Sequence, residues 1–314
     1  MIQVHNLVKK YGSHRAVDDL SFAVGKGELF GLLGPNGAGK TTTISVLATL
    51  LPGDGGSASI GGFDVADQSD DVRRLIGIVP QEIALYPDLN ARDNLNFWGR
   101  LYGLKGAALV SRVDELLEMA DLTAQAGQKV DGYSGGMKRR LNLAVGLVHA
   151  PEVLFLDEPT VGIDAHARSK ILTLIGDLAA GGLTVIYTTH YLEEAEQLCD
   201  RIGVIDQGRL VALGDKEDLI RQIGDEDCIR FQLAEDRIAT LEAASSRWQG
   251  FIKIGRHKGK VEIRAADGAS ILPELQGWFA GQGLVIEQLE IDRPNLEALY
   301  LNLTGHGLRE KVSE

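Results

Sequence analysis

The sequence predicts an α/β domain followed by a smaller α+β domain, and three observations lead to that prediction. Two apolar runs, residues 29–33 and 153–156, are typical of buried parallel strands. A glycine-rich loop stands between the first run and a helical pattern. After residue 224, short strand and helix patterns follow in the order βαββαβ. We therefore expect one domain over residues 1–222 and a second over residues 225–314.

Composition limits the classes of protein to which the chain can belong. Its 314 residues are enough for two domains, and a hydrophobic fraction of 44% indicates a folded globular protein. A net charge of −12 argues against a broad nucleic-acid surface, so we expect no nucleic-acid partner. The sequence has no apolar run of membrane-spanning length and no signal-peptide pattern, which predicts a cytosolic protein.

The glycine-rich loop fits the pattern of a phosphate-binding loop. Residues 34–42 read GPNGAGKTT, which matches G-x-x-x-x-G-K-[ST], with an apolar strand before and a helix after it. Glycines allow backbone N–H groups to approach phosphate oxygens, and the helix N-terminus adds its positive dipole end. Lys40 can reach the β- and γ-phosphates, and the Thr41 hydroxyl can ligate Mg²⁺. The expected nucleotide-binding residues of the loop are Asn36, Gly37, Ala38, Gly39, Lys40, Thr41 and Thr42.

An isolated aromatic residue precedes this loop. Residues 2–8 and 16–24 alternate apolar and polar side chains as half-buried strands do, and Tyr11 lies on the turn between them. A lone aromatic on a turn usually only packs. Because a phosphate loop is near in sequence, stacking of Tyr11 on an adenine base becomes a second interpretation.

A glutamine follows the next apolar run. The glycines of residues 52–65 predict a small antiparallel patch, and residues 74–81 (RLIGIVPQ) predict a strand that ends at Gln81. Ligands bind at the carboxyl ends of strands in parallel α/β sheets. The neutral oxygen of Gln81 is therefore a candidate to reach Mg²⁺ or its water.

The middle of the chain is predicted to be helical. Residues 90–102 and 107–119 show helical spacing of apolar side chains, and Trp98 and Tyr102 belong either to the core or to a docking surface. The next helix opens at Ser134, a candidate N-cap, followed by Gly135 and Gly136. Free N–H groups at such a helix start form a second candidate anion site.

A buried strand then ends in two acids. Residues 153–160 read VLFLDEPT, and carboxylates at the end of an apolar strand are costly unless a cation or ligand compensates for them. We interpret Asp157 as the acid on the Mg²⁺ side and Glu158 as a base that orients water. The alternative is an acid pair that merely begins a solvated loop. Asp164 either caps the helix over residues 165–178 or acts at an interface.

One of the seven histidines also follows a predicted buried strand. Residues 183–188 (LTVIYT) are apolar, and His190 stands directly beyond them, where the sheet is expected to bind ligand. We interpret the other histidines as structural. A helix over residues 191–199 and strands over residues 201–206 and 208–213 then complete the first domain.

The C-terminal pattern predicts a ferredoxin-like module. Its expected strands cover residues 228–233, 251–256, 260–265 and 284–291, and its expected helices cover residues 236–247 and 270–280. We find no phosphate loop, metal cluster or catalytic pair in this part of the sequence. It is interpreted as a dimer-stabilising or regulatory module, with structural padding as the alternative.

Together, these motifs resemble those of an ATP-binding cassette (ABC) ATPase subunit over residues 1–220. GPNGAGKTT resembles the Walker A loop, YSGGM the cassette signature and VLFLDEPT the Walker B strand. Tyr11 resembles the adenine-stacking residue, Gln81 the Q-loop glutamine, Glu158 the catalytic acid and His190 the switch histidine. The resemblance implies the P-loop NTPase fold with a mixed β core, an antiparallel β patch and a helical subdomain near residues 88–150.

The resemblance also implies cofactors, assembly and roles. It implies hydrolysis of ATP with Mg²⁺ by a head-to-tail homodimer, in which Ser134, Gly135 and Gly136 of one subunit contact the γ-phosphate held by the other and Asp164 crosses the interface. The implied catalytic residues are Glu158, His190, Lys40 and Gln81, and the implied Mg²⁺ ligands are Thr41, Gln81 and Asp157.

Two departures from the family pattern indicate a branch. Tyr133 and Met137 replace the first and last residues of the common LSGGQ, and residues 161–164 read VGID in place of SALD. With the stretch NLEALYLNLTG over residues 295–305, these resemble the daunorubicin-type ATPases that energise drug and polysaccharide export. The resemblance implies a permease on a separate chain and a cytoplasmic position at the inner face of the membrane. The alternatives are the ATPase of an importer and a non-transport ABC ATPase that acts on ribosomes or chromosomes.

Overall fold

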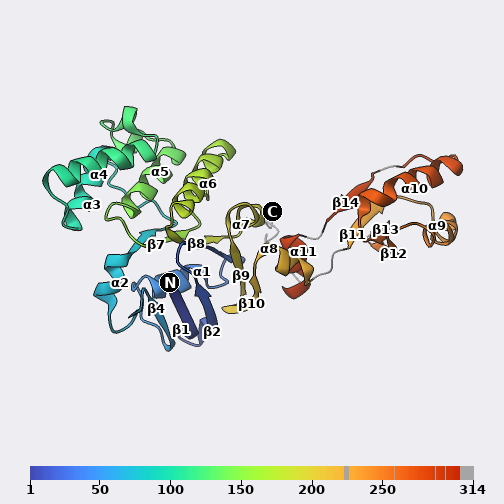
Figure 1. The fold of residues 1–314 in the computed structure, drawn as a ribbon, viewed down its shortest axis with the longest axis horizontal. Coiled ribbons are helices and arrows are strands. Elements are labelled where there is room, and N and C mark those ends of the chain that lie inside the picture. Colours follow the sequence, from blue (N-terminus) through green and yellow to red (C-terminus); the bar gives the residue numbers. More distant parts are fainter. Residues whose placement is uncertain (223–225, 258, 287, 294, 305–314) are drawn as a thin grey trace. The chain divides into compact units, whose positions relative to one another are not determined.

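The computed structural model describes residues 1–304 except 223–225, 258, 287 and 294. The chain divides into two compact units, Met1–Lys216 and Glu217–His306 (Figure 1). Within the described ranges, no helix is both long and apolar enough to cross a membrane.

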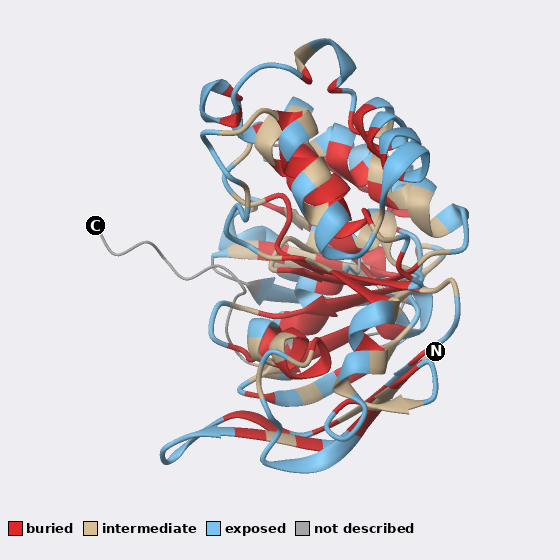
Figure 2. Cartoon of the chain, turned by 90° about the vertical axis from the view of Figure 1, so that its left-hand side faces the viewer, coloured by how far each residue is buried: buried red, intermediate tan, exposed pale blue. Residues whose placement is uncertain are grey.

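A six-stranded sheet forms the centre of the first unit. Its strands are, in spatial order, β10 (Arg209–Gly214), β9 (Arg201–Asp206), β3 (Leu29–Leu33), β8 (Thr184–Thr189), β7 (Val153–Asp157) and β6 (Ile76–Val79). All neighbours are parallel except β10 and β9. Every residue of β3, β7 and β8 is buried, which explains why their sequences are apolar without alternation (Figure 2).

A second, antiparallel sheet packs beside the first. It has the order β2 (His14–Val24), β1 (Ile2–Tyr11), β4 (Gly55–Ile60) and β5 (Phe63–Asp64), so the predicted antiparallel patch is present. The rings of Phe22 on β2 and Phe30 on β3 stack with centroids 5.1 Å apart. Helix α1 (Lys40–Leu47) contributes Ile44 and Leu47 to the same core. The strand β1 is longer than predicted, and Tyr11 is its last residue.

Three helices form a layer on the other face of the central sheet (Figures 1 and 2). They are α3 (Ala91–Leu101), α4 (Gly106–Met119) and α5 (Gly135–Gly146), with 3-10 turns at Thr123–Gln125 and Val130–Gly132. Their buried side chains form one hydrophobic cluster with α6 (Ala165–Ala180) and with sheet residues. Of the two aromatics singled out in the sequence, Trp98 packs partly buried against this cluster, whereas Tyr102 is 47% exposed.

The predicted strand over residues 74–81 was wrong at its start. Helix α2 (Ser69–Leu75) includes Arg74, and β6 occupies only Ile76–Val79. Ion pairs one turn apart, Asp70 with Arg73 at 2.9 Å and Asp71 with Arg74 at 3.0 Å, favour the helix. The short helices α7 (Leu192–Leu198) and α8 (Lys216–Arg221) complete the helices before residue 222.

The second unit has the predicted βαββαβ order. Its elements are β11 (Asp227–Phe231), α9 (Ile238–Ser245), β12 (Phe251–His257), β13 (Lys260–Ala265), α10 (Gly268–Gly281) and β14 (Glu290–Asp292), followed by α11 (Leu296–Thr304). A 3-10 turn, Glu235–Arg237, precedes α9. The sheet order is β12-β13-β11-β14, and β11 is antiparallel to both neighbours. Each βαβ crossing therefore spans one intervening strand, which is the split βαβ arrangement.

One face of this sheet forms the core of the second unit. Ile229 and Phe231 of β11 and Val261 and Ile263 of β13 are fully buried in one cluster with Phe279 of α10. The last strand is shorter than the predicted 284–291. The backbone at Gln288 has φ of +53°, a left-handed conformation that interrupts an extended strand.

Candidate active site

The candidate site lies at one edge of the central sheet. Strands β3, β6, β7 and β8 run parallel, so the loops after their carboxyl ends emerge on the same side. These loops begin at Gly34, Pro80, Glu158 and His190. The sequence motifs that are far apart in the chain are thus brought together by the strand order alone.

The phosphate loop has a conformation that requires glycine at two positions. At Gly39, φ is +106°, and a Cβ atom there would lie 2.3 Å from the carbonyl oxygen of Ala16. At Gly34, a Cβ would lie 2.3 Å from the carbonyl oxygen of Ile205. The loop therefore closes tightly against β2 and β9. Asn36 and Gly37 at its tip are exposed, so the loop presents its backbone to solvent.

Lys40 folds back across this loop. Its side chain is 5% exposed, and Nζ donates hydrogen bonds to the carbonyl oxygens of Gly34 (2.7 Å) and Pro35 (3.0 Å). Nζ also lies 3.0 Å from Oε1 of Glu158. The loop lysine and the acid after β7 are therefore direct partners, as two residues acting on one phosphate group would be.

Glu158 lies between two basic side chains. Its second carboxylate oxygen, Oε2, is 3.0 Å from Nδ1 of His190. Burial by itself raises the pKa of the Glu158 carboxyl, but the hydrogen bond to His190 and the charge and hydrogen bond of Lys40 outweigh that effect, so the pKa lies below its usual range. Glu158 is thus held as a carboxylate, the form that a base needs. Its φ is +45°, an uncommon conformation for a residue with a side chain.

Thr188 on β8 connects the two acids. Its hydroxyl donates to Oδ1 of Asp157 (2.7 Å) and accepts from the backbone N–H of Glu158 (3.0 Å). This threonine was not singled out in the sequence, because its role depends on the pairing of β7 with β8. The only sequence signal is a hydroxyl residue near the end of a buried strand.

Glu194 on α7 is a second functional candidate that sequence reasoning missed. It is 3% exposed and accepts hydrogen bonds from the hydroxyls of Thr160 (2.7 Å), Tyr187 (2.7 Å) and Thr189 (2.8 Å). Thr160 follows Glu158 closely in the chain, and Thr189 precedes His190. Glu194 thus fixes, from behind the site, both turns that bring Glu158 and His190 together. An acid on the buried side of a short helix was the available signal.

The donors for a divalent cation are of one chemical type. The predicted ligands are the hydroxyl of Thr41, the amide oxygen of Gln81 and the carboxylate of Asp157, which all supply oxygen, and Thr41 and Gln81 are exposed whereas Asp157 is buried. Oxygen donors that include a single carboxylate fit Mg²⁺, which retains waters and binds largely through substrate phosphates.

Among the described residues, the predicted site residues Tyr11, Ser134 and Asp164 make no hydrogen bond or ion pair with Lys40 or Glu158. Tyr11 is 50% exposed, with Nζ of Lys9 lying 5.8 Å from its ring centroid. Ser134 caps α5, since its hydroxyl accepts from the N–H of Met137 at 3.3 Å, and Asp164 caps α6 by accepting from the N–H of Ala167 at 2.8 Å. The predicted cap positions are therefore confirmed.

The signature segment is separate from the phosphate loop of its own chain. Among the described residues, no hydrogen bond or ion pair joins residues 134–136 to residues 34–42. Gly136 packs against α6, where a Cβ would lie 2.6 Å from the Cβ of Ala167, whereas Ser134 and Gly135 are exposed. The start of α5 thus offers an unobstructed helix N-terminus to solvent.

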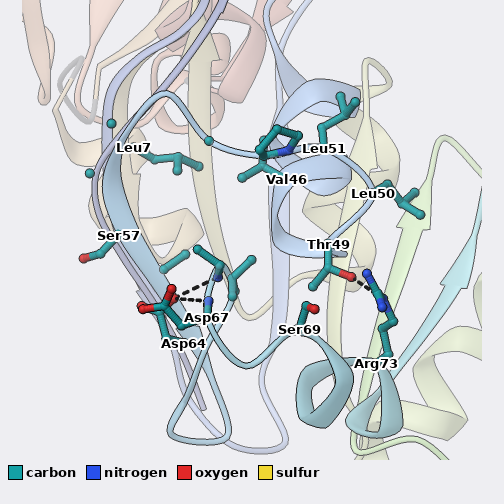
Figure 3. A pocket seen from close by; sticks show the side chains of 17 residues that line it. Leu7, Val46, Thr49, Leu50, Leu51, Ser57, Asp64, Asp67, Ser69 and Arg73 are labelled. Carbon is teal, nitrogen blue, oxygen red and sulfur yellow. Dashed lines mark hydrogen bonds between the residues drawn. The ribbon is translucent and has the colours of Figure 1, made fainter.

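The first unit also has a separate pocket of about 500 Å³ between β1, β4, α1 and α2 (Figure 3). Leu7, Val46 and Leu51 lie along one side, and Arg73 donates a hydrogen bond to Thr49 at 2.8 Å on the other. Within the described ranges, its lining includes none of the predicted nucleotide-binding residues. The pocket therefore does not belong to the candidate site.

A phosphate loop, two acids and a histidine at one sheet edge define the class of nucleotide-binding α/β ATPases. The family model described as "ABC transporter" matches residues 17–161. The linearmycin resistance ATP-binding protein of Bacillus subtilis is 44% identical over 99% of this chain and 100% of its own length. The chain belongs to the family of ABC transporter ATP-binding proteins.

Other relatives and solved structures agree with this assignment. A daunorubicin resistance ATP-binding protein of Streptomyces coeruleorubidus is 41% identical, covering 97% of this chain and 95% of that protein. The Nod factor export ATP-binding protein I of Cupriavidus pinatubonensis is 38% identical, covering 99% and 92%. A dimeric ATP-binding cassette solved in a post-hydrolysis state with ADP and Pi aligns with a TM-score of 0.63 at 28% identity, over 68% of this chain and 98% of that one. The expected ABC cassette fold is confirmed.

Proposed function

We propose that this protein is the ATP-hydrolysing subunit that powers an ABC exporter, together with a permease encoded separately. The observation that carries the proposal is the contact of Glu158 with both Lys40 and His190 beside the phosphate loop. In this arrangement, a positioned carboxylate lies next to the lysine that would hold the transferred phosphate.

In the proposed mechanism, the backbone N–H groups of residues 36–39, of which Asn36 and Gly37 are exposed, bind the phosphates. Lys40 then exchanges its contact with Glu158 for contacts with the β- and γ-phosphates. Glu158 then orients the attacking water, and His190 holds Glu158 through its ring nitrogen. Thr41, Gln81 and Asp157 would hold Mg²⁺, which supplies charge neutralisation for the phosphates. Tyr11, exposed at the end of β1, would stack on the adenine.

Two subunits would complete each site. The uncovered N-terminus of α5 at Ser134 and Gly135 fits the role of binding the γ-phosphate held by a second copy, and the exposed Asp164 would lie at the interface between copies. Support comes from the separation of residues 134–136 from the phosphate loop in one chain, since contact with phosphate then requires another chain.

An exposed aromatic group suits the contact with the permease. Tyr86 and Phe97 are 43% and 42% exposed, and their rings meet edge to face with centroids 4.8 Å apart. They lie just after Gln81 and on α3, so a partner that binds there would contact the segment next to the nucleotide site. In this proposal, the protein lies at the cytoplasmic face of the membrane, bound to the permease.

The names of the relatives support the export direction, and the domain roles are proposed from the sequence. Resistance and Nod factor export are printed in the names of proteins that match nearly the full length of this chain. We propose that residues 1–222 form the ATP-binding domain, with residues 88–150 as its helical subdomain. Residues 225–314 would form an accessory domain that stabilises the dimer or regulates it.

The proposal is tested by the variant Glu158→Gln. Loss of a positioned base typically lowers kcat by about 10² to 10⁴, whereas binding of Mg·ATP, measured by calorimetry, should be retained. Glu152→Gln is the matched control, because the Glu152 side chain is 51% exposed and pairs with Lys26 at the surface. Hydrolysis at the wild-type rate in Glu158→Gln would remove this residue from the mechanism, and no heat on adding Mg·ATP to the wild type would end the proposal.

A further inference from the structure

Arg139 connects three segments that have separate roles in the proposed function: helix α5, residues 80–81 and the turn at Val161. The side chain starts from the helix that Ser134 opens. Its guanidinium donates hydrogen bonds to the backbone carbonyl of Gln81, to that of Pro80 (3.5 Å) and to that of Val161 (3.2 Å). In the proposed function, Gln81 binds Mg²⁺ in the chain's own site. Val161 lies three residues before Asp164, which the proposal places at the interface with a second copy.

This arginine is an unusual core residue. It is 9% exposed, and burial lowers the pKa of its guanidinium. Among the described residues, its hydrogen-bond partners are backbone carbonyls, and no carboxylate lies within ion-pair distance. Burying a cation without a counter-charge costs several kcal/mol in general. A neutral apolar side chain would fill the same space without the free-energy cost of burying a charge. The hydrogen bonds of Arg139 to the backbone carbonyls therefore need an explanation.

The segment after Gln81 is also held by other side chains of the helical layer. Asn142, one turn beyond Arg139 on α5, accepts from the N–H of Ala84 at 3.1 Å. Asn94 of α3, fully buried, bonds both the N–H (2.8 Å) and the carbonyl (3.0 Å) of Tyr86. The stretch 80–86 has no regular secondary structure, so these side chains replace a backbone ladder. It is therefore fixed to the helices and must move with α5.

We infer that Arg139 is a positioning residue that joins the two nucleotide sites of the dimer. The inference rests on the proposed function, in which Ser134 and Asp164 act at the partner's nucleotide and Gln81 acts at the chain's own. A shift of α5 on binding the partner's nucleotide moves the guanidinium, and the guanidinium displaces the backbone of Gln81 and of Val161 together. The planar fork of arginine can bond several carbonyls at once, which an ammonium group cannot do in the same geometry.

A double-mutant cycle separates this role from simple packing. Arg139→Gln removes the fork, Gln81→Ala removes the side chain that Arg139 positions, and Asp164→Ala removes the residue at the end of the second segment. We expect Arg139→Gln to lower kcat by about tenfold with little change in KM. In the background of Gln81→Ala or Asp164→Ala, the same change should cost less than about twofold, because coupled residues are not additive.

Two further variants complete the kinetic test. Arg140→Gln is the matched control and should keep wild-type kcat, because this neighbouring arginine on α5 pairs with Asp121 at 2.9 Å and not with residues 80–81 or 161. Arg139→Lys, which retains the charge, should recover part of the loss. If Arg139→Gln fails to fold, Arg139→Lys replaces it in both cycles.

Hydrogen exchange without nucleotide provides an independent readout. The amides of residues 82–86 and 162–164 should exchange faster in Arg139→Lys than in the wild type and the control. Unchanged exchange in both stretches, or kcat losses that multiply in either cycle, would overturn the inference. An inactive wild type would instead refute the proposed ATPase function, and the exchange result would still decide whether Arg139 braces the two segments.

Discussion

Both units of the chain combine helices with sheets, but they differ in how deeply their charged side chains are buried. In the first unit, Lys40, Arg139, Asp157, Glu158 and Glu194 are all less than 10% exposed. In the second, the ion pair between Arg230 and Glu262 and its neighbours lie on the open face of the sheet, with Arg230 25% exposed. These five buried charges surround one sheet edge, and two others of the first unit, Lys9 and Asp18, lie on the antiparallel sheet. Among the described residues of the second unit, Asp227 is the only charge that is comparably buried, at 7% exposed, and its other charged side chains pair along the strands.

This difference favours the first unit as the one that carries out the chemistry. Burying an ionised side chain is costly, so a group of them persists where the charges act on a ligand or position those that do. Ion pairs at a protein surface contribute little and do not require a function. If the comparison holds, substitutions of buried charges in the first unit should change turnover, and those on the open sheet of the second should change only stability.

The largest effect after Glu158→Gln is expected for Glu194→Ala. The change leaves three buried hydroxyls without their acceptor and releases the turns that carry Glu158 and His190, so kcat should fall by about 10- to 100-fold. Steady-state ATPase assays measure it. Gln197→Ala, at an exposed position of the same helix, serves as the control. Normal turnover in a folded Glu194→Ala protein would contradict the claim that the buried charges of the first unit support catalysis.

Tyr11→Ala should weaken nucleotide binding while leaving kcat at saturation unchanged. An exposed ring that stacks on a base contributes about 1 to 3 kcal/mol, which corresponds to roughly 5- to 150-fold in Kd. Titration of ATP by calorimetry measures the change, and Tyr11→Phe should keep the wild-type affinity because its ring is intact. A Kd that is the same in Tyr11→Ala as in the wild type would refute the stacking role.

The pH dependence of kcat/KM should reflect the lowered pKa of Glu158. A base with a lowered pKa stays ionised to more acidic pH, so activity falls only as the pH drops through that lowered value. His190→Ala removes one of the contacts that lower the pKa and should therefore shift the acid limb of the residual activity to higher pH. An acid limb at the wild-type position in that variant would show that the histidine does not control the charge of Glu158.

The smallest effect is expected for Glu262→Gln in the second unit. Burial alone raises the pKa of Glu262, but hydrogen bonds from Arg230 and Arg264 outweigh it and lower the pKa. Its contribution to stability is thus present above the unfolded-state pKa and lost as the pH falls through the folded-state value. We expect a loss of about 1 kcal/mol at neutral pH, which shrinks in acid, with turnover changed less than about twofold.

Tryptophan fluorescence can measure the unfolding of the second unit separately. Two of the three tryptophans, Trp248 and Trp278, lie in it, so Trp98→Phe leaves emission that reports on its unfolding alone. Urea titrations at neutral and acid pH then measure the difference in free energy of unfolding between Trp98→Phe and the double variant Trp98→Phe/Glu262→Gln. A large fall in turnover for Glu262→Gln would show that the second unit takes part in catalysis and would contradict the comparison.

The sequence predicted the parts of the molecule that depend on local chemistry. The phosphate loop, the caps at Ser134 and Asp164 and the acids after β7 each follow from residues close together in the chain. Arg139 was missed because its partners at residues 80, 81 and 161 are distant in sequence. Glu194 was missed because its link to Thr160, 34 residues away, depends on the fold, although its partners Tyr187 and Thr189 are close in sequence. The start of β6 was wrong since apolar residues continue from helix α2 into the strand without a break.

The backbone of Glu158 has a consequence for engineering. A residue with a side chain at a φ of +45° lowers the stability of the fold by about 1 to 3 kcal/mol relative to one that tolerates this conformation. Selection of variants for heat resistance alone should therefore favour glycine or asparagine at position 158. The same selection would discard the only acid that contacts both Lys40 and His190 among the described residues, so thermostable libraries of this protein need a screen for turnover at that position.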